Sequence, residues 1–272
     1  MPKVNVEENV MVASANGFQL GVDIARPSDS DGNATGVLFL PGGGWVSADH
    51  KPLKERYGIP LAERGFVCVT APYRIMEQAI WPAAIQDVKA ILRWMRTNSG
   101  SLGIDPERIA VAGKSAGGHL ALLTAATNGK VEYEGPGINS AELSRVSAAV
   151  GVAPASDIRK YWRREPLGPY TASDSSDAAL TAANPAELVH GDWPPIMLLH
   201  GTSDERVDHR MSMRLFDLLE EAGVTADMRL FAGQDHMFDG IPEFSNAIVE
   251  SVAFFLERYV TAPVAEAVAA DD

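Results

Sequence analysis

The stretch RIAVAGKSAGGHLALLTAAT, residues 108–127, decides the fold. It predicts an apolar strand, a tight turn and an apolar helix, with the pattern G-x-S-x-G at the turn. In such a turn the serine adopts a strained backbone conformation, and Gly113 and Gly117 leave room where side chains would collide. The five-residue pattern alone is common, but its strand and helix context makes it specific. We therefore expect Ser115 to be a nucleophile presented at the end of a strand.

Short apolar runs recur along the chain and predict further strands. They cover residues 37–40, 66–71, 109–112, 148–153, 196–200 and 228–231. Segments of helical period lie between them, one beginning after Pro82 and another covering 211–222. Two N-terminal segments, 4–13 and 18–26, alternate apolar and polar residues, which predicts antiparallel strands. The fold class is therefore α/β, with about eight mostly parallel strands, an antiparallel N-terminal edge and helices on both faces.

The length of 272 residues predicts one α/β domain over residues 1–260. Residues 154–192 form a connection too long for a simple turn and are a candidate small lid. Their aromatic residues are candidates either to line a pocket or to pack the insertion onto the domain: Tyr161, Trp162 and Tyr170. Residues 261–272 are expected to be a disordered tail.

Composition and charge exclude several classes of function. The formal net charge of −13 argues against nucleic-acid partners and anionic membranes, because both need clustered lysine and arginine. The sequence contains no recognisable targeting or transmembrane segment, so a cytoplasmic location is expected. Cys68, the single cysteine, lies in an apolar run and is expected to be a buried core residue. A homo-oligomer is left open.

A nucleophilic serine requires a base and an acid that orients the base. In this fold type the chain order is serine, acid, histidine. In PPIMLLHGTSDERVD, residues 194–208, Asp204 lies just beyond the carboxyl end of a predicted strand. In MRLFAGQDHMFDG, residues 228–240, His236 lies in the loop after the next strand. Ser115, Asp204 and His236 are therefore the predicted catalytic residues.

Other histidines and carboxylates fit this order less well. His119 lies one helical turn beyond Ser115, and His200 is still on its strand, so both are predicted to be structural. Glu205 and Asp208 lie near Asp204 and remain alternatives for the acid.

A second loop follows the predicted strand 37–40, in GVLFLPGGGWVSADH, residues 36–50. Acyl transfer creates a negatively charged oxygen that needs backbone N–H donors, and the first strand-to-helix loop of such a sheet lies beside the nucleophile. Gly43, Gly44 and Ala116 are the predicted oxyanion donors. Pro41 followed by glycine predicts a type II turn that fixes this loop.

The three glycines of this loop also resemble a dinucleotide-binding pattern, G-x-G-x-x-G, with Ser47 in the last place. Such a site requires an acidic residue at the end of the second strand. Here that strand ends in TAPYR, residues 70–74, which carries no carboxylate. The sequence therefore favours an oxyanion site over a phosphate site.

Four motifs in this order, PGGGW, GKSAGG, HGTSDERV and QDH, make the chain resemble serine esterases of the α/β-hydrolase superfamily. Tyr73 and Arg74, followed by WPAAIQDVKAILRWM, resemble the hormone-sensitive-lipase-like branch in particular. Pro41 replaces the histidine of that branch's HGGGW loop, and Lys114 stands where that branch often has an acidic residue. The elbow and the acid motif are more similar to those of feruloyl esterases, acetylxylan esterases and arylformamidases.

The resemblance implies a serine carboxylesterase that hydrolyses short-acyl esters of small molecules without a metal or another cofactor. Two alternatives share the same residues, an amidase or arylformamidase and a feruloyl or acetylxylan esterase acting on carbohydrate-linked esters. Aromatic side chains near the expected site are candidates to contact the substrate. They are Trp45, Tyr73, Trp81 and Phe238.

Overall fold

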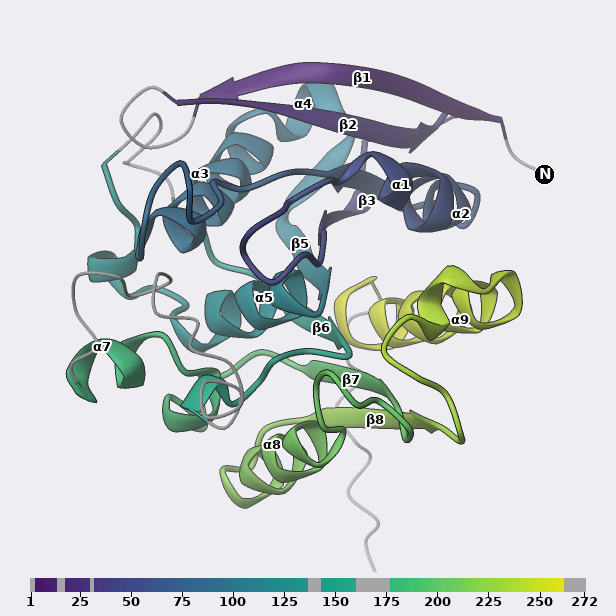
Figure 1. The fold of residues 1–272 in the computed structure, drawn as a ribbon. Coiled ribbons are helices and arrows are strands. Elements are labelled where there is room, and N and C mark those ends of the chain that lie inside the picture. The colour runs from purple at the N-terminus through teal and green to yellow at the C-terminus, as the bar shows by residue number, and fades with distance from the viewer. Residues whose placement is uncertain (1–2, 14–17, 30–31, 137–142, 160–176, 262–272) are drawn as a thin grey trace, which may run out of the picture.

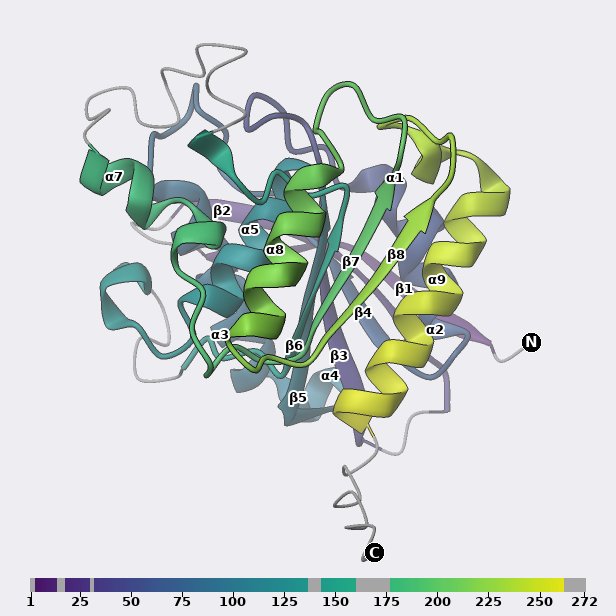
Figure 2. The same cartoon turned by 90° about the horizontal axis from the view of Figure 1, so that it is seen from below.

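The computed structural model describes residues 3–13, 18–29, 32–136, 143–159 and 177–261. Their strands form one eight-stranded sheet in the order β1-β2-β4-β3-β5-β6-β7-β8 (Figures 1 and 2). β2 pairs antiparallel with both β1 and β4, and every other pairing is parallel. The strands are β1 (Val4–Ala13), β2 (Gln19–Pro27), β3 (Ala34–Leu40), β4 (Val67–Thr70), β5 (Ile104–Lys114), β6 (Ala148–Val152), β7 (Ile196–Gly201) and β8 (Ala226–Phe231). The predicted sheet and its antiparallel edge are confirmed.

Helices cover both faces of the sheet (Figures 1 and 2). One face carries α3 (Ala83–Thr97), α5 (Ala116–Ala126) and α8 (Arg210–Glu221), and the other carries α2 (Ile59–Ala62) and α9 (Pro242–Leu256). The shorter helical segments are α1 (Lys51–Leu53), η2 (Lys54–Gly58), α4 (Ser99–Leu102), η3 (Val131–Tyr133), α7 (Asp177–Ala182), η4 (Pro185–Glu187), η5 (Phe238–Gly240) and η6 (Glu257–Thr261).

None of the helices in the described ranges combines the length and the apolar character that a membrane crossing requires.

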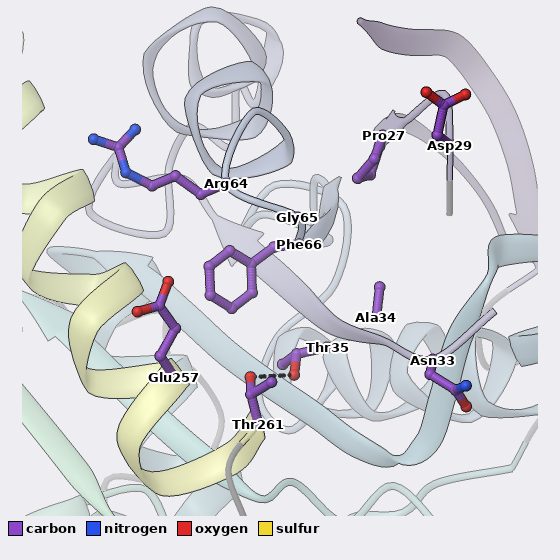
Figure 3. Close-up of a pocket in the computed structure, with 10 residues that line it drawn as sticks. All are labelled: Pro27, Asp29, Asn33, Ala34, Thr35, Arg64, Gly65, Phe66, Glu257 and Thr261. Carbon is purple, nitrogen blue, oxygen red and sulfur yellow. Dashed lines mark hydrogen bonds between the residues drawn. The ribbon is translucent and has the colours of Figure 1, made fainter. Parts of the chain in front are cut away.

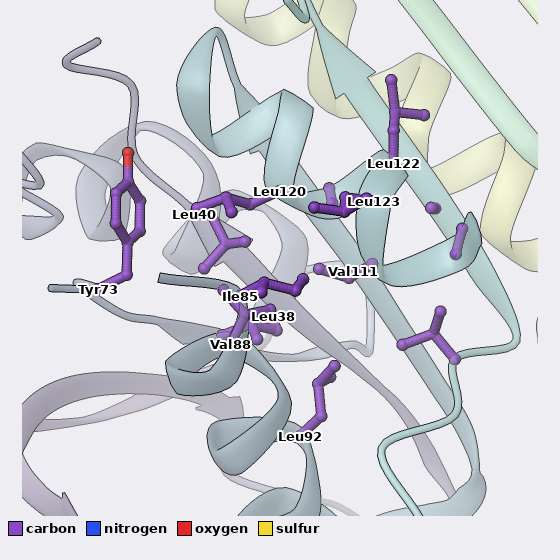
Figure 4. Close-up of a cluster of buried hydrophobic side chains, with 14 of the residues drawn as sticks. Leu38, Leu40, Tyr73, Ile85, Val88, Leu92, Val111, Leu120, Leu122 and Leu123 are labelled. Atoms are coloured by element: carbon purple, nitrogen blue, oxygen red, sulfur yellow. The ribbon is translucent and has the colours of Figure 1, made fainter. Parts of the chain in front are cut away.

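Each face of the sheet buries its own apolar cluster. On the first face, Val88 and Leu92 of α3 and Leu120 of α5 pack with Leu38 and Val111 of the sheet (Figure 4). The side chains of these five residues are fully buried. The spacing of Val88 and Leu92 places them one turn apart on one helix face, as the helical period predicts.

On the second face, Phe39 of β3 stacks on Tyr57 of η2, with ring centroids 4.2 Å apart. Leu61, Val249 and Val252 belong to the same buried cluster. Because the strands are covered on both sides, they are apolar on both sides, which is why they occur as continuous apolar runs. Buried Cys68 lies in this cluster as predicted, and desolvation raises the pKa of its thiol to about 12.

Several element boundaries differ from the expected ones, and both β3 and β8 begin before their apolar runs, at Ala34 and Ala226. β5 begins at Ile104, five residues before the apolar run, because Ile104 pairs with Ala34 across the sheet. The polar residues between Ile104 and the apolar run belong to the strand because of backbone pairing, which cannot be predicted from apolar residues alone. Thr261, placed in the expected tail, belongs to η6, and its hydroxyl oxygen lies 2.9 Å from that of Thr35.

Some expectations concern residues outside the described ranges. They include the remaining tail, 262–272, and the three aromatic residues of the 154–192 segment, which are Tyr161, Trp162 and Tyr170. Within that segment the structure describes α7 and η4. The lid role of the segment stays a prediction.

Candidate active site

Ser115 lies at the sharp corner between β5 and α5. Its backbone has φ 52° and ψ −115°, a conformation that residues with a side chain rarely adopt. Hydrogen bonds on both sides of the residue hold it there. The Ser115 N–H donates to the Val152 carbonyl at 2.9 Å, and the His119 N–H donates to the Ser115 carbonyl at 2.8 Å. The predicted elbow is thus present in the backbone.

The two glycines of the G-x-S-x-G pattern permit close backbone approaches. A Cβ at Gly113 would lie 2.2 Å from the Gly117 carbonyl oxygen. A Cβ at Gly117 would lie 2.4 Å from the carbonyl oxygens of both Leu40 and Pro41. Both distances are far below van der Waals contact, so no side chain fits at either position. The same closeness brings the glycine loop after β3 against the start of α5.

A chain of hydrogen bonds joins the three predicted catalytic residues. His236 Nε2 lies 3.0 Å from Ser115 Oγ, and His236 Nδ1 lies 2.6 Å from Asp204 Oδ2. Asp204 follows β7 and His236 follows β8, so both come from loops at the carboxyl edge of the sheet. Parallel strands end at the same edge, which explains how residues 121 positions apart meet. Neither Glu205 nor Asp208 has a recorded contact with His236 in the described part of the chain.

The Asp204 carboxylate accepts hydrogen bonds on both oxygens. Oδ1 accepts from the backbone N–H groups of Arg206 at 2.9 Å and Val207 at 2.8 Å. Oδ2 is shared between His236 and His200, whose Nε2 lies 3.1 Å away. Burial alone would raise the pKa of Asp204, but the hydrogen bonds from His200, His236 and Val207 outweigh it and hold that pKa well below its ordinary value. Asp204 is therefore ionised at neutral pH.

A second buried carboxylate, Asp239, lies three residues after His236 in the chain. Lys114, the residue before Ser115, forms an ion pair with Asp239 Oδ1 and also donates to the His236 carbonyl at 2.9 Å. Asp239 Oδ2 accepts from Arg56 at 2.8 Å and from the Tyr57 hydroxyl at 3.2 Å. Desolvation lowers the pKa of Lys114, and Asp239 opposes that effect. This cluster ties the strand of the nucleophile to the loop of the histidine.

The glycine loop has a different turn from the predicted one. Gly42 lacks the positive φ that the third residue of a type II turn requires, so the type II turn at Pro41 is wrong. The observed turn starts at Gly43, three residues after the start of the predicted one, and in it the Val46 N–H donates to the Gly43 carbonyl at 3.1 Å. Its central residues, Gly44 and Trp45, have φ of 58° and 59°, as in a type I′ turn.

Tyr73 holds the start of this loop. Its buried hydroxyl donates to the Pro41 carbonyl at 3.0 Å. Among the described residues, no acceptor is recorded for the N–H groups of Gly43, Gly44 or Ala116. The Ala116 N–H belongs to the first residue of α5, where no carbonyl of the helix itself is available.

A cavity of about 540 Å³ joins the serine to the glycine loop. Its volume lies within the range typical of small-molecule sites. Ser115 and His236 lie in its wall, and its other lining residues come from the glycine loop, α1, η2, the end of β5 and the loops after β7 and β8. These are Pro41, Gly42, Gly43, Gly44, Asp49, Pro52, Leu53, Arg56, Lys114, Arg206 and Met237.

A second cavity lies near the start of β3, away from the serine, and is lined by Thr35, Arg64 and Glu257 among others (Figure 3). Among its described lining residues are two threonines, Thr35 and Thr261, but no serine, cysteine or histidine that could form a nucleophile and base pair like that of Ser115 and His236.

The four aromatic residues predicted to contact the substrate are not in the wall of the cavity that holds Ser115. Trp45, Tyr73 and Phe238 are buried in the two core clusters, and Trp81 packs against one of them. These positions favour packing, and Tyr73 has the additional contact with Pro41 described above. Contact with a substrate stays a prediction for these residues.

Sequence reasoning missed three residues of the site. Lys114 and Asp239 are 125 positions apart and carry no local signal of pairing. The sequence places His200 on a strand and so predicts a structural role for it. Its spacing of four residues from Asp204 was the signal that could have linked the two residues. His119 is fully buried with Nε2 2.7 Å from the Ala183 carbonyl oxygen, and desolvation lowers its pKa to about 4.

Within the described residues, no cluster of histidine, cysteine and carboxylate side chains could hold a metal ion.

Solved structures share this architecture. A truncated carbohydrate esterase from gut microbiota is 26% identical, with a TM-score of 0.83 over 95% of this chain and 97% of that chain. The apo form of esterase 2 from Thermogutta terrifontis is 25% identical, with a TM-score of 0.77 over 96% of both chains. The fold is the α/β-hydrolase fold.

Sequence relatives agree with this comparison. Esterase LipQ of Mycobacterium tuberculosis is 30% identical over 243 residues, which cover 85% of this chain and 57% of LipQ. The chain thus spans little more than half the length of this relative. The BD-FAE family model matches residues 22–219, a range that includes Ser115 and Asp204. The chain therefore belongs to the BD-FAE family, within the α/β-hydrolase serine esterases.

Proposed function

We propose that the chain is a serine esterase that hydrolyses short-acyl carboxylic esters through Ser115, His236 and Asp204. The observation that carries this proposal is the continuous hydrogen-bond chain from Ser115 Oγ through both ring nitrogens of His236 to Asp204 Oδ2, at 3.0 and 2.6 Å. A histidine that contacts a serine hydroxyl through one ring nitrogen and a carboxylate through the other can act as the base that removes the hydroxyl proton.

The tautomer of His236 follows from its partners. Ionised Asp204 can only accept, so it holds the proton of His236 on Nδ1. Nε2 is then left with a lone pair directed at the hydroxyl of Ser115. As Ser115 Oγ bonds to the ester carbonyl carbon, its proton passes to His236 Nε2. The resulting imidazolium is stabilised by the Asp204 carboxylate.

The tetrahedral intermediate then collapses. The carbon–oxygen bond to the leaving alcohol breaks, and the alcohol takes the proton from His236 Nε2. Water repeats the sequence on the acyl-enzyme, giving its proton to His236 and releasing the carboxylic acid and the free Ser115. The steps consume one water and require no cofactor.

Gly43, Gly44 and Ala116 are the proposed donors to the negatively charged oxygen. Two observations support them, their location around Ser115 and the lack of a recorded acceptor for their N–H groups among the described residues. Each such donor typically stabilises the transition state by about 2.7–4 kcal/mol. The glycine loop is thus nearly as important to the proposed reaction as the histidine.

The size and lining of the cavity support small substrates. Its volume is about 540 Å³, and Pro41, Leu53 and Met237 provide apolar walls. The relatives reported above are named as esterases, one of them a carbohydrate esterase. A small acyl group on an alcohol or a sugar fits this combination.

The test is the hydrolysis of 4-nitrophenyl acetate by the wild type and by Ser115→Ala. We expect kcat to fall by about 10⁶-fold, because the three residues act as one unit. Ser203→Ala serves as the control, since Ser203 lies in the loop of Asp204 but outside the hydrogen-bond chain. A Ser115→Ala rate within tenfold of the wild type would overturn the proposal.

The same assay with acetyl, butyryl and octanoyl esters and with 4-nitroacetanilide defines the substrate class. We expect the short esters to be the fastest. Fastest turnover of the octanoyl ester would contradict the short-acyl preference, and fastest turnover of the anilide would support the amidase alternative.

A further inference from the structure

His200 contacts the same carboxylate oxygen of Asp204 as the proposed base, His236. Its imidazole is fully buried at the end of β7. Nε2 lies 3.1 Å from Asp204 Oδ2 and 3.0 Å from the Val207 carbonyl oxygen, and Nδ1 lies 2.8 Å from Ser212 Oγ. Both ring nitrogens therefore have polar partners inside the protein.

These partners determine where the ring carries its proton. A carboxylate oxygen and a carbonyl oxygen can only accept, so His200 Nε2 must carry the hydrogen that both share. Nδ1 then has a lone pair, which accepts from the hydroxyl of Ser212. Asp204 Oδ2 consequently receives two imidazole N–H donors, one from His200 and one from His236.

We propose that His200 is a positioning residue for the esterase reaction, which fixes the orientation of Asp204 and weakens the attraction of its carboxylate for the proton of His236. This inference rests on the proposed function. With Oδ1 held by the N–H groups of Arg206 and Val207, the bond from His200 leaves the carboxylate no freedom to rotate.

The second effect concerns the pH range of activity. An oxygen that already accepts one N–H bond stabilises a neighbouring imidazolium less than an oxygen that accepts none. Loss of the His200 donor should therefore strengthen the attraction between the Asp204 carboxylate and the Nδ1 proton of His236, which is expected to move the acidic limb of the activity profile to higher pH. The low pKa of Asp204 is consistent with its two imidazole donors.

Other charged groups around this carboxylate do not change when His200 is replaced. His209 lies 6.5 Å from His200 between ring centroids and contacts Asp208 at 3.6 Å. Lys114 approaches from β5 on the side of Ser115. The remaining charged groups on these loops and on α8 are Glu205, Arg206, Arg210, Arg214, Asp217, Glu220, Glu221, Asp235 and Asp239.

The experiment compares the pH profile of kcat/KM for 4-nitrophenyl acetate in the wild type, His200→Phe and His200→Gln. In His200→Phe we expect the acidic limb to move to higher pH by about 0.5–1 unit and the plateau to fall about tenfold, the size of one lost hydrogen bond. In His200→Gln the amide can donate to Asp204, so the limb returns toward the wild-type position.

His119→Phe is the matched control, since it replaces another fully buried histidine that does not contact Asp204. Its acidic limb should stay in place. If His200→Phe lowers the plateau but leaves the limb unmoved, His200 has only a structural role and the inference is wrong.

Ser212→Ala provides a second test should His200→Phe fail to fold. Loss of the hydroxyl removes the donor that holds His200 Nδ1, so a smaller shift of the limb in the same direction is expected. An unchanged limb in Ser212→Ala would then overturn the inference. An inactive wild type would instead overturn the proposed function, which keeps the two failures distinguishable.

Discussion

Two buried carboxylates are linked to His236, Asp204 directly and Asp239 through Lys114, and they differ in the kind of partner that each one holds. Both side chains are fully buried. Asp204 accepts from two imidazoles and two backbone N–H groups. Asp239 accepts from Lys114, Arg56 and the Tyr57 hydroxyl.

The difference assigns the two carboxylates different tasks. An imidazole can gain and lose a proton near neutral pH, so a carboxylate bonded to one can respond to proton transfer. Lys114 and Arg56 form ion pairs with Asp239, and Asp239 has no hydrogen bond to the His236 ring among the described residues, so we expect Asp239 to hold structure. A buried carboxylate near a histidine is thus not by itself a catalytic acid, and its other partners decide its role.

The largest expected effect comes from Asp204→Asn. The amide can present its NH₂ group to His236 and stabilise the wrong tautomer, so we expect kcat for 4-nitrophenyl acetate to fall by about 10⁴-fold. Asp208→Asn, which changes a nearby carboxylate that contacts His209, is the control and should remain near the wild-type rate. A large loss in Asp208→Asn with a small one in Asp204→Asn would reverse the assignment of the acid.

Asp239→Asn should mainly affect stability. It removes the charge that compensates two partly or fully buried cations, for which the typical cost is about 3–5 kcal/mol of the free energy of unfolding. Urea unfolding measures this loss. Asp105→Asn, which breaks a partly exposed pair with Arg108, should cost about 1 kcal/mol or less. Should Asp239→Asn unfold like the wild type but lose activity as Asp204→Asn does, the contrast between the carboxylates would fail.

The smallest expected effect is the pH dependence that Asp204 gives to stability. Its pKa is lower in the folded protein than the value of about 3.9 for an unfolded chain. The stabilisation is therefore present above that value and is lost as the pH falls through the folded pKa. Calorimetry measures the difference in Tm between the wild type and Asp204→Asn. This difference should have its full size near pH 5 and should shrink as the pH falls below about 4. A difference that grows below pH 4 would contradict this sign.

Most of the sheet could be predicted from apolar runs, because burial on both faces leaves few polar positions in a strand. The patterning located β6 and β7 to within one residue of their observed ends. It did not locate the start of β5, where pairing with β3 and not burial sets the limit. Local pattern also failed at Gly42, which follows a proline but lacks a positive φ and lies so close to Ser115 that an added Cβ would be 3.3 Å from the Ser115 Cβ.

The site could be predicted where chain order and strand ends determine it. Asp204 and His236 follow consecutive strands, and parallel pairing of β7 with β8 brings their loops together. Lys114 and Asp239 could not be predicted in this way, because their meeting depends on the path of η5 after β8. The partners of His200 likewise depend on how α8 begins, since Ser212 lies in its first turn.

The contacts of Lys114 have a consequence for motion. Lys114 is covalently next to Ser115, and it bonds both the carbonyl of His236 and the carboxylate of Asp239 three residues further on. We therefore expect a displacement of the end of β5 to be transmitted through Lys114 to the loop after β8. Fluctuations of the sheet edge should then shift Ser115 and His236 together. We expect the distance between Ser115 and His236 to vary less than the positions of the surrounding elements.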